Sequence, residues 1–140
     1  MSESKKNLLR WIAVIPGSLL AGFLSTFPLH WLLYLAYARN GTLLGFIELP
    51  PGSNVSIEHF IYPCIIALVF VYTGSEIAPK HKFKTAVVLS VLYLLFMVSS
   101  LFWATRSGLE ISLSIRTIGP VVGLLLGLLI VFRKLKENKL

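Results

Sequence analysis

The chain has 140 residues, of which 56% are hydrophobic and only 14% are charged, and it carries a formal net charge of +7. Soluble domains have about a quarter of their residues charged, so this composition excludes an ordinary water-soluble fold and predicts an integral membrane protein. The length leaves no room for a separate soluble domain beside several membrane spans. We therefore expect residues 1–140 to form a single transmembrane domain.

Four apolar stretches follow one another along the chain, at residues 11–38, 60–78, 85–105 and 113–132. Each is long enough to cross the hydrocarbon layer, because a helix rising ~1.5 Å per residue needs ~20 residues to cover ~30 Å. The expected fold class is all-α, an integral membrane bundle of four helices. The lipid bilayer is thus the first expected partner.

The first stretch is unusually long, with 28 uncharged residues from Trp11 to Ala38. This length far exceeds the ~7 to 15 apolar residues of a cleavable signal peptide. It also exceeds the need of one upright helix, so the helix must tilt or bend, and Pro16 and Pro28 mark the positions for a bend. Small residues recur every four positions within it and would share one helix face open to close packing: Gly17, Ala21 and Ser25.

The connection from Asn40 to Ile57 is the only long loop, and its first half is apolar. We expect this loop to lie in the headgroup region or to cap the bundle, as an outward recognition surface.

The second stretch is the weakest span, because only sixteen residues from Phe60 to Ser75 are uncharged. Pro63 is expected in the first helical turn, where a missing amide costs nothing. Glu76 lies near the far end, within reach of the headgroups or of the lysines that follow it. The single cysteine, Cys64, allows no intrachain disulfide and is expected to be a small buried residue.

The fourth stretch contains a doubled G-x-x-x-G pattern at Gly119, Gly123 and Gly127. These glycines share one helix face, where another helix backbone can approach closely. Two interpretations follow. The first and fourth stretches pack on each other inside a monomer, or one small-residue strip faces outward and makes a homo-oligomer or binds a membrane partner subunit.

The basic residues indicate the orientation of the spans. Ten of the thirteen fall on one side of the membrane when all four stretches cross it: Lys5, Lys6, Arg10, Lys80, Lys82, Lys84, Arg133, Lys134, Lys136 and Lys139. Because Lys and Arg are retained in the cytoplasm during insertion, both termini are expected there, with the long loop outside. These charges also attract anionic headgroups, at about 1 kcal/mol each. They form no continuous stripe, so no nucleic-acid partner is expected.

Ionisable groups within a membrane are functional candidates, and the sequence offers five: His30, Glu58, His59, Glu76 and Arg116. We expect His30 to form an interhelical hydrogen bond and Arg116 to pair with Glu58 or Glu110. Histidines and carboxylates can bind zinc, but no pair of them has the spacing that places two ligands on one helix face. No metal site is therefore expected.

The chain contains no H-E-x-x-H, no G-x-S-x-G and no phosphate-binding glycine loop. Neither a catalytic residue nor a cofactor is predicted. The preferred interpretation is a small accessory or scaffold subunit of a plasma or bacterial inner membrane, assembling through small-residue helix faces. The alternatives are a small oligomeric transporter or channel and, less favoured, a membrane enzyme with its site in the outer polar residues.

Overall fold

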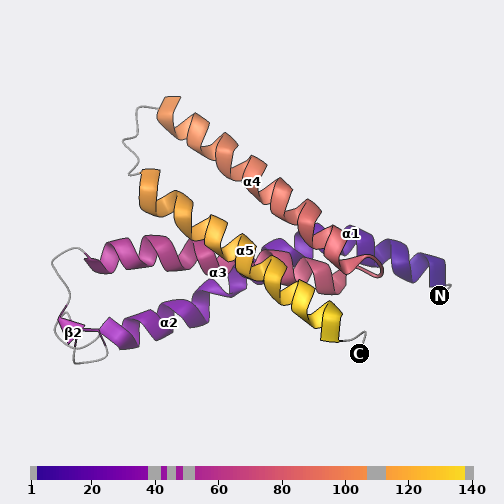
Figure 1. Ribbon diagram of the computed structural model, residues 1–140, viewed down its shortest axis with the longest axis horizontal. Coiled ribbons are helices and arrows are strands. Elements are labelled where there is room, and N and C mark those ends of the chain that lie inside the picture. The colour runs from indigo at the N-terminus through magenta and orange to yellow at the C-terminus, as the bar shows by residue number, and fades with distance from the viewer. Residues whose placement is uncertain (1–2, 38–41, 44–46, 49–52, 107–112, 138–140) are drawn as a thin grey trace.

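A computed structural model describes residues 3–37, 42–43, 47–48, 53–106 and 113–137. Apart from two strands of two residues each, every described element is a helix, as predicted (Figure 1): α1 (Glu3–Leu24), α2 (Thr26–Tyr37), β1 (Thr42–Leu43), β2 (Ile47–Glu48), α3 (Ser53–Ile77), α4 (Lys82–Arg106) and α5 (Leu113–Glu137). Within this part of the chain, four helical segments are long and apolar enough to cross a membrane: Glu3–Ala36, Ile57–Ile77, Lys82–Trp103 and Thr117–Glu137.

The first span bends between α1 and α2, at Ser25. Pro28 has no amide to donate to the carbonyl of Leu24, so the helical hydrogen bonds stop at the last residue of α1. Beside the bend, the hydroxyl of Ser25 donates to the carbonyl of Gly22 at 2.7 Å. Pro16, the other predicted bend position, lies within α1 without interrupting it.

The helix α3 begins earlier than expected, at Ser53, so the connection that precedes it ends before Ile57. The prediction began at Phe60 because Ser53 and Asn54 are too polar for an apolar span. Serine and asparagine nevertheless favour the start of a helix, so the helix extends beyond the apolar stretch. Pro63 is consequently an interior residue of α3, and its expected place in the first turn is wrong. Within the connection, β1 and β2 pair antiparallel, with Leu43 opposite Ile47.

The helix α3 lies at the centre of the fold, and α1, α2, α4 and α5 all pack against it. In the described residues α1 and α5 do not pack on each other, so the expected contact between the first and fourth spans is wrong. The glycine face of α5 and the face of α1 that carries Ser18 and Gly22 are directed at α3 instead. One end of the molecule, which we call the basic end, is where α1 and α4 begin and α3 and α5 end (Figure 1). The β1–β2 hairpin lies at the opposite, hairpin end.

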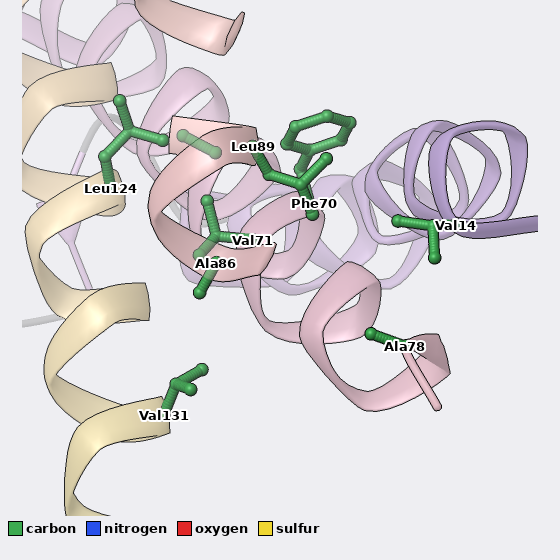
Figure 2. Packing of buried hydrophobic residues seen from close by; sticks show 9 residues of the cluster. Val14, Phe70, Val71, Ala78, Ala86, Leu89, Leu124 and Val131 are labelled. Atoms are coloured by element: carbon green, nitrogen blue, oxygen red, sulfur yellow. The ribbon is translucent and has the colours of Figure 1, made fainter. Parts of the chain in front are cut away.

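The buried apolar cluster connects all four span-length segments (Figure 2). Its members are Val14, Ala67, Phe70, Val71, Ala78, Ala86, Leu89, Leu124 and Val131. Three of them are alanines without exposed surface, which lets the helix backbones come close together. Many large apolar side chains face outward, as expected where the surroundings are hydrocarbon and not water.

The helix α4 joins this cluster only through its first half, which supplies Ala86 and Leu89. Towards Arg106 it diverges from α3 (Figure 1). In this second half one row, Met97 and Leu101, is half-buried, and the other side of the helix exposes large side chains, including Leu95, Phe96 and Val98 at 59%, 74% and 59%. We call residues 94–103 the distal segment of α4.

Candidate functional site

The glycines of α5 lie against the backbone of α3. A Cβ on Gly119 would overlap the carbonyl oxygen of Phe60, and one on Gly123 would overlap that of Cys64. A Cβ on Gly127 would lie 3.3 Å from the carbonyl oxygen of Leu68. Both sets of partners advance by four residues in the same direction, so α3 and α5 are parallel and meet along i, i+4 rows. The glycine strip is therefore used within the chain.

The row of α1 most deeply buried against α3 is one position away from the predicted strip, although Gly17 also borders α3, where a Cβ on it would lie 2.7 Å from the side chain of Ile77. Ser18 and Gly22 are buried, whereas Gly17, Ala21 and Ser25 lie half-buried beside them. Any two residues four positions apart lie on the same face of a helix. The spacing of small residues therefore cannot show which of the two neighbouring rows of α1 faces α3.

Gly74 of α3 provides the space for this packing. A Cβ there would overlap both the side chain of Leu89 from α4 and the hydroxyl of Ser18 from α1. The hydroxyl of Ser18 donates to the carbonyl of Val14 in its own helix, so the buried oxygen is satisfied. Gly74 was not among the predicted packing residues, because it forms only a single pair with Ala78, four positions on, and not a row of three small residues.

Glu76 forms the centre of an ion-pair cluster at the basic end. Its Oε2 lies 2.9 Å from Nζ of Lys82 in α4, and its Oε1 lies 3.1 Å from Nζ of Lys134 in α5. Lys134 also donates to the hydroxyl of Tyr72 at 3.2 Å, and its Nζ lies 5.3 Å from the centre of that ring. The carboxylate, whose side chain is 31% exposed, thus uses both oxygens to connect three helices.

The helix α1 joins the same cluster through Arg10. Its Nε donates to the carbonyl of Ile77 at 3.1 Å, and its Nη2 lies 3.5 Å from the carbonyl of Glu76. These carbonyls are in the last turn of α3, where no intrahelical amide is available and the helix dipole favours a cation. Arg10 therefore caps α3 from a different helix. The charge of Arg10 was counted in the sequence, but nothing in its spacing indicates this partner.

His30 takes part in the interhelical hydrogen bond expected of it. Its Nδ1 lies 2.9 Å from the hydroxyl of Tyr62 and joins α2 to α3. The two side chains border an open pocket of about 290 Å³, together with Thr26, Phe27 and Trp31. This arrangement places a polar pair among aromatic rings in the hairpin-end half of the molecule.

The predicted polar candidates do not form one site. Tyr62, the partner of His30, precedes Glu76 by fourteen residues on α3, which corresponds to about 21 Å along the helix. Glu58 and His59 are half-buried near the start of α3. Arg116 belongs to α5, but its side chain lies outside the described part, as do Arg39 and Glu110. Among the described residues, no three potential metal ligands come together.

Comparison of the chain with protein-family models, with curated proteins and with solved structures finds no match.

Proposed function

We propose that the chain is an accessory or scaffold subunit that assembles sideways, within the membrane, with another membrane protein. The observation that carries this proposal is the distal segment of α4. Its inner row, Met97 and Leu101, is only half-buried, and its outer side exposes large side chains, including Leu95, Phe96 and Val98. A helix from another subunit would cover it.

Two small hydroxyl residues in the distal segment support the same assignment. Ser99 donates to the carbonyl of Leu95 at 2.8 Å, and Ser100 donates to that of Met97 at 2.7 Å. Both serines are exposed, and their hydroxyls are satisfied within the helix. Small residues of this kind are enriched where transmembrane helices pack closely on one another. The glycine strip of α5 is already covered by α3, so the proposed surface is on α4.

The proposed orientation places the basic end in the cytoplasm and the β1–β2 hairpin outside. Nine of the described basic residues gather at the basic end, and Arg106 is at the end of α4 that lies away from it. The positive-inside rule supports this orientation in a plasma or bacterial inner membrane. Reporters fused after Leu140 and within residues 52–54 test it, and a cytoplasmic signal from the second fusion would overturn it.

The decisive experiment is to determine the composition of the complex that a tag after Leu140 retains from native membranes in mild detergent. We expect a stoichiometric second protein. Phe96→Ala should reduce its recovery at least several-fold, whereas Leu125→Ala, at an exposed position of α5, should leave it unchanged. Equal recovery from both variants contradicts assembly through the distal segment. A pure homo-oligomer favours the alternative, an oligomeric transporter or channel, which flux assays on Glu76 and His30 variants would then test.

A further inference from the structure

An apolar groove lies between α1 and α4 at the basic end. Both helices pack on α3 but not on each other in the described residues. Gly74 brings Ser18 and Leu89 together on the surface of α3, and the helices separate from there. The groove between them has a volume of about 360 Å³.

The walls of the groove are hydrocarbon. The helix α1 contributes Trp11, Val14 and Ile15, and α4 contributes Val88, Leu89 and Leu92. Water is unfavourable in such a space, and a groove on the side of a membrane-embedded bundle is in contact with lipid chains. Its length along α4, from Lys84 to Leu92, is about 12 Å, which suits the first carbons of an acyl chain and not a bulky ligand.

The polar residues of the groove come from the first turn of α4 and from the residue that precedes it. They are His81, Lys84 and Thr85. Lys84 is exposed and makes no ion pair with any described residue, whereas Lys82, two positions earlier, is bound to Glu76. Trp11 lines the groove from α1, and tryptophan is favoured at the level of the headgroups.

We propose that this groove binds one anionic phospholipid, with an acyl chain between α1 and α4 and the phosphate at Lys84. The proposal requires that the chain is embedded in a membrane, but it does not depend on assembly with a partner. An anionic headgroup neutralises the positive charge of Lys84 more completely than a zwitterionic headgroup does, because the zwitterionic headgroup has no net charge. A lysine near an anionic surface contributes enough to change lipid binding about fivefold.

Native mass spectrometry of the purified full chain tests this proposal, with equal amounts of phosphatidylglycerol and phosphatidylcholine carrying the same acyl chains. We expect one phosphatidylglycerol to be retained about fivefold more than phosphatidylcholine. Lys84→Gln should remove this preference. Arg133→Gln, which removes an exposed charge from the same end, should preserve it. Leu92→Trp should fill the groove and reduce the binding of both lipids, whereas Leu129→Trp, at an exposed position of α5, should not.

Three results would overturn the proposal. Equal retention of the two lipids would show that the headgroup charge is not recognised. If Arg133→Gln and Lys84→Gln reduced the preference for phosphatidylglycerol equally, the preference would come from general surface charge. Undiminished binding in Leu92→Trp would mean that the acyl chain lies elsewhere. Each of these measurements uses the chain alone, so they are independent of the partner recovered through the distal segment of α4.

Discussion

Gly123 of α5 lies so close to the carbonyl oxygen of Cys64 in α3 that a single added methyl group has no room. We expect Gly123→Ala to reduce stability by about 1–3 kcal/mol, the usual cost of overpacking a rigid contact. Alanine favours a helix more than glycine does, so a net loss would come from the contact between helices. The thermal unfolding midpoint in mild detergent measures it, and an unchanged midpoint would contradict this packing.

The glycines of α5 should differ in their sensitivity. A Cβ on Gly127 would lie 3.3 Å from the carbonyl oxygen of Leu68 and 3.3 Å from Cβ of Val71, which is tight but not an overlap. Gly127→Ala should therefore lower the midpoint less than Gly123→Ala does. The reverse order would mean that α5 is shifted along α3.

Glu76→Gln should weaken the connection of α3 to α4 and α5. Glutamine keeps only one of the two oxygens that bind Lys82 and Lys134 and carries no charge. Because these side chains are partly exposed, we expect a loss of roughly 1 kcal/mol, smaller at high salt. The loss is measured by unfolding the unchanged chain and the Glu76→Gln variant at low and at high salt. Glu3→Gln is the control, since Glu3 is 86% exposed and, among the described residues, pairs only with Lys6, at 3.6 Å; an equal loss there would contradict a special role of Glu76.

Arg10→Lys should loosen the end of α3 without removing the positive charge. Lysine has no planar fork to bind two successive carbonyls, as Arg10 does at Ile77 and Glu76. We expect faster hydrogen exchange in the last turn of α3 and unchanged exchange near Gly123. Lys6→Arg, which alters a neighbouring exposed cation, is the matched control. Unchanged exchange at the end of α3 would mean that another group caps it.

The pair of His30 and Tyr62 should show a measurable coupling energy. His30→Phe and Tyr62→Phe each remove one partner of the 2.9 Å hydrogen bond between α2 and α3. In a double-mutant cycle we expect a coupling of about 0.5–1.5 kcal/mol, the usual net contribution of such a bond. Additive effects of the two substitutions would show that the side chains act independently.

The sequence predicted the helical class and four segments able to span a membrane, because hydropathy and length alone determine these features. It did not predict which helices meet. The glycine repeat of α5 marked a close contact, but a repeat on one helix does not identify the other, and α3 carries no matching strip of small residues. Phe60, Cys64 and Leu68 receive the glycines through their backbone carbonyls, which are common to every residue type.

For the candidate sites too, the sequence predicted contacts between residues near in the chain better than contacts between distant helices. Pairing of Glu76 with the lysines that follow it was one of two predicted possibilities, since Lys82 is only six residues away, whereas the contribution of Lys134 depends on α5 lying beside α3. Pro63 was misplaced because the polar start of α3 does not resemble a membrane span. Side-chain chemistry near in sequence was thus predictable, and contacts between distant helices were not.

The contact between α3 and α5 also has a consequence for how the protein is made. The two helices are separated by α4, so α3 leaves the ribosome well before the glycines that cover its backbone have been synthesised. Until then the side of α3 carrying Cys64 must be sheltered by lipid or by the insertion machinery. The same interval separates Glu76 from Lys134, so this carboxylate acquires its second cation only when translation is nearly complete. Maturation of the bundle is therefore tied to its last helix, because a nascent chain that ends before residue 113 has neither the glycines that cover α3 nor the second cation of Glu76.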